Sequence, residues 1–178
     1  MEAANVVFVP ALAIAFGFPR DALEAIALGL AIAAAAGFLV VGAAYWRAVD
    51  LRLRLGDTKV TGRALALADR VEKPLIVICG LAIVATVVAL TANGWTRAVI
   101  AAASLALLAA LEYINYYHRQ LQNFDHAADF KRLLARRRLK VSHMARDLAA
   151  WRVETSRVDA LNHIVGTKAA DAPDIATV

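Results

Sequence analysis

Three long runs of apolar residues, separated by short polar segments, dominate the pattern of this chain. The runs cover residues 25–46, 74–92 and 98–117, and the third contains one charged residue, Glu112. A helix that rises 1.5 Å per residue needs about 20 apolar residues to cross a hydrocarbon core of about 30 Å. The pattern therefore predicts an all-α integral membrane protein with three transmembrane helices, which form a membrane domain over residues 22–117.

The second and third runs are predicted to form a helical hairpin. Pro74 suits the first turn of a helix, where its missing N–H has no partner to lose. Residues 91–95 read Thr-Ala-Asn-Gly-Trp, which is typical of a tight turn with an aromatic residue at headgroup depth. The two helices should therefore lie antiparallel.

The amino-terminal segment, residues 1–21, contains a shorter apolar run. Residues 5–18 are too few to span a membrane comfortably, Pro10 interrupts them, and no basic start marks a signal peptide. We expect a re-entrant or interfacial segment with the amino terminus outside. A short fourth span is the alternative.

The polar segment 47–73 is predicted to contain two helical pieces. Residues 51–55 continue the first span, Gly56 and Asp57 break the helix, and a second helix covers residues 61–72. The second piece has an apolar face, which suits a helix lying on the inner membrane surface. A packed connector between two spans fits the same pattern.

Beyond residue 117 the chain becomes polar and basic. Residues 118–165 are predicted to form amphipathic cytoplasmic helices, one of which starts at an N-cap, Ser142, and runs to about His163. Its apolar positions are Met144, Leu148, Trp151, Val158 and Leu161. The small, polar residues 166–178 are expected to be a disordered tail.

The distribution of Lys and Arg predicts the orientation. Only Arg20 and Arg97 of the 20 basic residues lie on the side of the 91–95 turn; the others lie in residues 47–73 or after the third span. Basic residues accumulate on the cytoplasmic side of membrane proteins. We therefore expect a multi-pass protein of the plasma (inner) membrane with a cytoplasmic carboxy terminus.

The end of the third span carries the strongest candidate site. On a continuous helix Glu112, Asn115, Tyr116 and Arg119 share a face, with His118 beside it. Polar groups at this depth suggest a groove for a lipid headgroup, an ion or a partner helix. Alternatively, Tyr113, Tyr116 and Tyr117 form an aromatic belt at the membrane surface, with Glu112 paired to Arg119 or to a neighbouring helix.

Two further groups of residues are weaker candidates. A basic run made of Arg136, Arg137, Arg138 and Lys140 should lie near the inner leaflet and attract anionic headgroups, unless it serves only as a topology signal. The run lacks the interleaved aromatics typical of nucleic-acid binding, so no nucleic-acid partner is expected. The second group contains His118, Asp125, His126 and Asp129, of which His118, Asp125 and Asp129 would share a face of a continuous helix, as metal ligands could. Their spacing matches no specific metal motif.

Small residues repeat every fourth position in two spans. The first span has Gly29, Ala33 and Gly37, and the third has Ala102, Ala106 and Ala110. Small residues at this spacing let helix backbones approach closely in a membrane. The two stripes are predicted to face each other or another subunit.

No motif for a nucleotide, a haem or an iron–sulfur cluster is present, so no cofactor is expected. The leading interpretation is a non-catalytic accessory or scaffolding subunit that packs with other membrane subunits, or with a second copy of itself, in a larger membrane complex. It would contact the anionic headgroups of the inner leaflet or a cytoplasmic partner. A lipid-headgroup enzyme or binding protein that uses residues 112–119 is the first alternative. A small oligomeric channel or transporter is the second.

Overall fold

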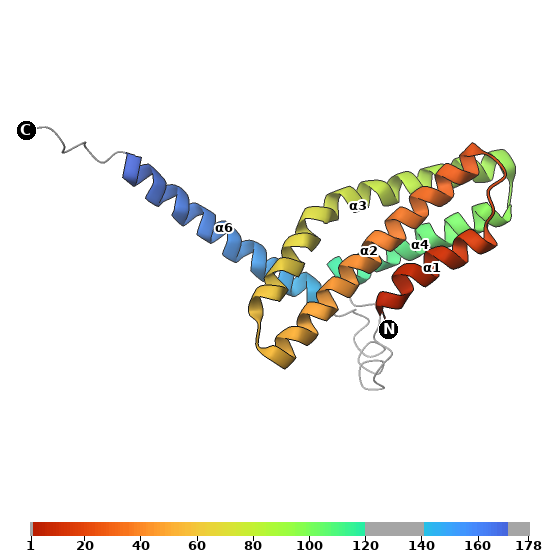
Figure 1. Cartoon of the computed structure of the whole chain (residues 1–178). Coiled ribbons are helices and arrows are strands. Elements are labelled where there is room, and N and C mark those ends of the chain that lie inside the picture. Colours follow the sequence, from red (N-terminus) through yellow and green to blue (C-terminus); the bar gives the residue numbers. More distant parts are fainter. Residues whose placement is uncertain (1, 120–140, 171–178) are drawn as a thin grey trace, which may run out of the picture.

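The computed structural model describes residues 2–119 and 141–170, which form a helical bundle with one projecting arm (Figure 1). Its helices are α1 (Glu2–Phe16), α2 (Ala22–Leu55), α3 (Thr58–Asn93), α4 (Arg97–Tyr117) and α6 (His143–Ala170). Helices α2, α3 and α4 are long and apolar enough to cross a membrane, in agreement with the three predicted spans.

The bundle has two ends that differ in character. One end carries the α2–α3 connection, the end of α4 and the start of α6, and we call it the basic end. The turn end carries residues 17–21 and the turn at residues 93–96. At the basic end Gly56 closes α2 in the left-handed conformation (φ 70°) and donates its N–H to Arg52 O at 2.9 Å. The predicted break at Gly56 and Asp57 is confirmed.

Helix α3 corrects the prediction of two separate helices in this region. It runs without interruption from Thr58 to Asn93 and contains Pro74 in its interior. Proline removes one helical hydrogen bond and bends a helix, and α3 is visibly bent between its two halves (Figure 1). Thr61, Leu65 and Ala68 are buried, so the first half is packed and does not lie free on a surface.

Helix α1 packs lengthwise against α2 and α4 (Figure 1). Val9 and Ala13 pack against the core, and the following Gly17 lies close to Ala101 Cβ and Ala98 Cα of α4. An interfacial helix would lie across the ends of the spans, which α1 does not do. The re-entrant segment and the fourth span stay predictions.

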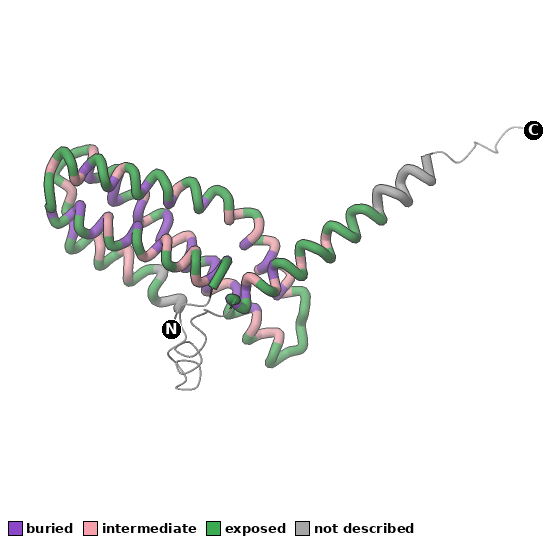
Figure 2. Tube along the Cα trace, turned by 180° about the vertical axis from the view of Figure 1, so that it is seen from behind, coloured by how far each residue is buried: buried purple, intermediate pink, exposed green. Residues whose placement is uncertain are grey.

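The core is a seam of buried positions, many of them alanine, with a spacing that alternates between three and four. In Figure 2 the buried stretches of the long helices lie along the inside of the bundle. In α2 the buried positions include Ala27, Ala31, Ala34, Phe38, Val41, Tyr45 and Ala48. In α3 they are Thr61, Leu65, Ala68, Leu75, Cys79, Ala82, Thr86 and Ala89. This is the 3.5-residue repeat of helices that pack at a small crossing angle.

The predicted stripes of small residues do not face each other. Gly29 and Ala33 are exposed, and only Gly37 approaches a neighbouring helix, at Leu75. Ala102 and Ala106 are buried in the core, whereas Ala110 is half-buried. A spacing of four drifts around a helix that packs with a 3.5-residue repeat, which is why the stripes leave the seam. Contact with another subunit stays a prediction.

Helix α6 begins where predicted but ends later. Ser142 caps it, because its Oγ accepts the Ala145 N–H at 3.1 Å. The predicted end was about His163, with a disordered tail from Gly166, but α6 continues to Ala170. A single glycine costs a helix only about 1 kcal/mol relative to alanine, so Gly166 does not end it.

We expect Gly17→Ala to weaken the packing of α1 on α4. The added Cβ would lie 2.7 Å from Ala101 Cβ and 3.2 Å from Ala98 Cα, and the backbone there cannot move aside easily. Overpacking of this kind costs about 1–3 kcal/mol, measurable as reversible unfolding in mixed micelles. Gly29→Ala is the control, because its Cβ would meet nothing within 4 Å. Equal stability of the two variants would contradict the packing.

Candidate functional site

The most elaborate structure outside the seam is the joint between α6 and the basic end. Met144 and Leu148, on the first turns of α6, are almost fully buried in the core of the bundle. Just before them, Ser142 donates its hydroxyl to Tyr116 O, and residues 119 and 141 form an antiparallel bridge. The start of α6 is therefore attached directly to the end of α4.

Polar side chains attach α6 to the other two long helices. Tyr45 of α2 donates its hydroxyl to Asp147 Oδ2 at 2.8 Å. Arg152 Nε donates to Asp69 Oδ1 of α3 at 2.6 Å, and a second guanidinium nitrogen binds Glu72. The buried apolar contacts of Met144 and Leu148 hold α6 against the bundle, and these polar bonds fix its direction.

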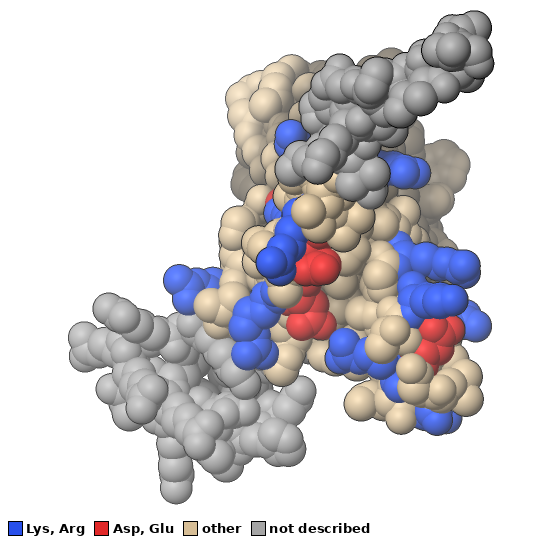
Figure 3. Space-filling model, turned by 90° about the vertical axis from the view of Figure 1, so that its left-hand side faces the viewer, with Lys and Arg blue, Asp and Glu red and all other residues tan. Residues whose placement is uncertain are grey.

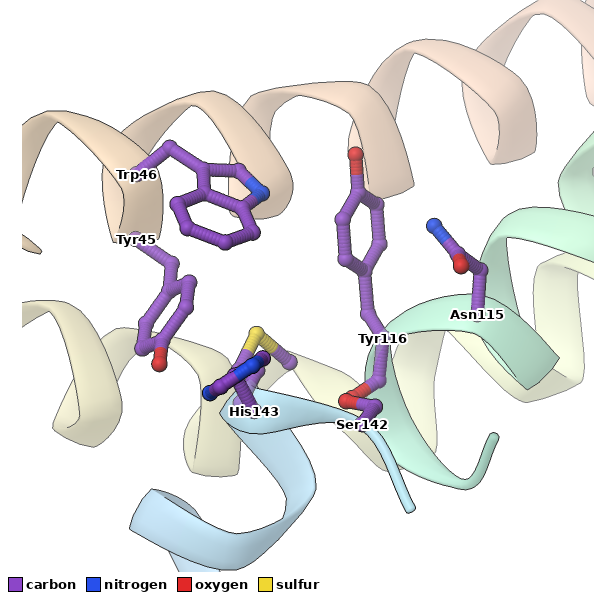
Figure 4. A pocket seen from close by; sticks show the side chains of 7 residues that line it. Tyr45, Trp46, Asn115, Tyr116, Ser142 and His143 are labelled. Carbon is purple, nitrogen blue, oxygen red and sulfur yellow. The ribbon is translucent and has the colours of Figure 1, made fainter. Parts of the chain in front are cut away.

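A small cavity lies inside this joint (Figure 4). Its volume is about 30 Å³, and it is lined by Tyr45, Trp46, Asn115, Tyr116, Ser142, His143 and Met144. A cavity needs about 10–15 Å³ on this measure to hold one water molecule. The space therefore fits one or two waters and is too small for a lipid headgroup.

The structure brings only part of the predicted 112–119 site together. Helix α4 ends at Tyr117, so Arg119 does not continue the face of Glu112 and Asn115. Asn115 and Tyr116 line the cavity, and Glu112 is half-buried one turn earlier. His118 is exposed, with its ring edge-on to Tyr113 at 4.9 Å between centroids. The continuous helix on which the sequence placed this polar face therefore ends at Tyr117, before Arg119.

The tyrosines of this region do not form a belt at the surface either. Tyr116 and Tyr117 are buried, and Tyr113 is half-buried. Tyr117 donates its hydroxyl to Ala68 O at 2.8 Å and so joins α4 to α3. The ring of Tyr116 lies where a side chain at Gly42 of α2 would be. These tyrosines are packing residues of the bundle.

Several predicted residues fall outside the described part of the chain. Asp125, His126 and Asp129 of the candidate metal set lie there, as do Arg136, Arg137, Arg138 and Lys140 of the basic run. Within residues 2–119 and 141–170, no three His, Cys, Asp or Glu residues gather in a way that would hold a metal ion.

Sequence reasoning missed a second polar cluster, at the turn end. Glu24 is only 1% exposed, and its carboxylate accepts the Arg20 N–H at 2.8 Å and the Thr96 hydroxyl at 2.8 Å. Asn93 donates its amide to Asp21 at 2.7 Å and to Glu24 at 3.3 Å. The cluster ties the start of α2 to the α3–α4 turn. Glu24, three residues after a capping Asp21, was the available signal.

Charge is concentrated at the basic end (Figure 3). Lys and Arg side chains gather there with fewer acids between them, and two of those acids, Asp69 and Glu72, form ion pairs with Arg152. Negatively charged headgroups near such a surface would be attracted.

The comparisons with known proteins give no family. No protein-family model matches the chain, and no curated protein or solved structure matches it.

We expect Leu148→Ala to detach α6 from the bundle. The variant removes a side chain that is almost fully buried, and such a change costs about 2–5 kcal/mol. Hydrogen exchange of amides 143–152 should become faster. Leu161→Ala on the same helix is the matched control, since Leu161 is 56% exposed. Unchanged exchange in Leu148→Ala would show that the apolar contact does not hold the arm.

Asp21 should make the turn end sensitive to acid. The Glu24 N–H and the Asn93 amide donate to its carboxylate and lower the pKa of Asp21. Its stabilising contribution is thus complete above the unfolded pKa of about 3.9 and is lost as the pH falls through the lower folded value. Asp21→Asn keeps the cap but removes this titration. Between about pH 5 and pH 2 the thermal unfolding temperature should fall less for the variant than for the unchanged protein. Parallel plots of unfolding temperature against pH for the two proteins would contradict the prediction.

Proposed function

We propose that this chain is a non-catalytic subunit of a membrane complex, with α6 as a cytoplasmic arm that holds a partner protein. The proposal rests on the way in which α6 is attached to the bundle at its base and projects from it beyond. Its base is joined to α2, α3 and α4 by buried side chains and by Arg152 and Tyr45. Its outer part projects from the bundle (Figures 1 and 2). Rigid attachment followed by projection suits a docking element.

The membrane assignment rests on three features. Helices α2, α3 and α4 are long and apolar enough to span. Trp46 near the basic end and Trp95 at the turn end are both exposed, as expected for residues at the two membrane surfaces. Basic residues are concentrated in and around the α2–α3 connection and in the region after α4. We therefore place the basic end in the cytoplasm.

The partner-binding position on the arm is Val158. The docked positions Met144, Leu148 and Trp151 follow spacings of four and three, and this series continues through Thr155 to Val158. Val158 is 45% exposed. An apolar residue that extends a docked face is a natural contact for a second helix.

Lipid-headgroup chemistry is less well supported than a scaffold. Among the described residues, the polar cavity at Asn115 and Tyr116 has room for water only. The two larger hollows, one between α1 and α4 and one between α3 and α4, are lined almost wholly by apolar side chains.

Topology is tested with single cysteines in a Cys79→Ala background. A membrane-impermeant maleimide is applied to intact cells in which no outer membrane shields the plasma membrane. The cysteine of the Trp95→Cys variant should be labelled at once. Leu161→Cys should be labelled only after the membrane is opened. The reverse pattern would overturn the orientation.

Partner binding is tested with a photo-crosslinking amino acid at Val158 in native membranes. We expect one discrete crosslinked protein, which should be lost when Leu148→Ala is added. The same amino acid at Asp159, on another face of α6, is the control. Equal crosslinking at both positions, or none at Val158, would remove the support for a docking arm.

A further inference from the structure

The face of α6 opposite its docked side is exposed. At 100° per residue, Arg146, Ala149, Val153, Arg157 and Ala160 fall on one side of the helix. We call this set the arginine–alanine face. All five residues are exposed, and Val153 is 70% exposed. The face therefore offers apolar surface and two cations to something outside the bundle.

The acids of α6 avoid this face. Asp147, Glu154 and Asp159, the acids of the described side chains of α6, project in other directions. Asp147 in addition accepts a hydrogen bond from Tyr45. An apolar face that contains arginines and excludes acids complements an anionic lipid surface, because arginine buries its stem and keeps its charge at headgroup depth.

The position of α6 also favours contact with an anionic lipid surface. Its first turn lies beside Tyr45, Trp46 and Tyr116, where the apolar runs of α2 and α4 end. From there α6 leaves the bundle at a steep angle and does not continue along its axis (Figures 1 and 2). A helix that starts at the depth where spans leave the bilayer and turns sideways runs along the membrane surface.

We propose that the arginine–alanine face rests on the anionic inner leaflet and supports the outer part of α6, whose base is already oriented by the bundle. This inference depends on the proposed insertion of α2, α3 and α4. It adds a lipid contact to the partner contact at Val158, on a different side of the same helix. Membrane composition would thereby control how firmly the outer part of α6, which carries Val158, is held at the membrane surface.

The experiment uses the full chain in nanodiscs, one copy in each, with an environment-sensitive fluorophore on a single cysteine in the Cys79→Ala background. The label is placed at Val153 or, as the control on another face, at Asp159. The discs contain phosphatidylcholine alone or with phosphatidylglycerol. A label at Val87, which is exposed on the apolar half of α3, reports insertion of the spans.

With phosphatidylglycerol, the Val153 label should shift its emission to the blue and resist an aqueous quencher, and the Asp159 label should do neither. The double variant Arg146→Gln with Arg157→Gln should shift the equilibrium by about 30-fold from lipid-bound to free α6, because each basic residue near the surface contributes about 1 kcal/mol. Added salt should act in the same direction.

Three results would overturn the inference: equal quenching at Val153 and Asp159, protection at Val153 that is the same without phosphatidylglycerol, or protection that survives loss of both arginines. If the Val87 label is itself open to the aqueous quencher, the proposed membrane insertion fails and the lipid contact of α6 fails with it. A protected Val87 label with an unprotected Val153 label overturns the lipid contact alone.

Discussion

The close approach of α2, α3 and α4 along a seam of small residues is the interaction on which the rest of this structure depends. Alanines such as Ala31, Ala82 and Ala102 are fully buried and bring the backbones together. Lipid is as apolar as these side chains, so helices in a bilayer associate through close packing and not through hydrophobic exclusion from water. A seam with a 3.5-residue repeat keeps α2 and α3 in contact from Ala27 to Ala48 and from Thr61 to Ala89, and this contact positions both ends of the bundle.

Each end of the bundle adds polar contacts that the seam alone cannot provide. At the turn end the buried Glu24 carboxylate binds Thr96 and the Arg20 backbone, which fixes two connections to each other. At the basic end the seam places Tyr45, Asp69 and Glu72 around the start of α6. The arm is oriented only because three helices arrive at one level in register.

Our functional interpretation follows from this division. The apolar part of the bundle presents alanine, valine and leucine, whereas the described polar contacts between helices lie at its ends. A protein built in this way can hold an arm at a defined place on a membrane. The proposed partner contact at Val158 and lipid contact at Val153 lie on different sides of α6, so both can be occupied together.

Local sequence patterns predicted the three long apolar helices, a turn at residues 91–95, the break at Gly56 and the cap at Ser142, because these are local properties of composition and backbone. It did not predict which face of each helix is buried. Alanine is so frequent that Gly29 and Ala33 look as suitable for packing as Ala27 and Ala31, and only the mutual register of three helices separates them. The same limit applies to the candidate site: the end of α4 at Tyr117 and the inward turn of its tyrosines depend on contacts with Ala68, Gly42 and Ser142. These partners lie 26 to 74 residues away in the sequence, and only the tertiary structure brings them together.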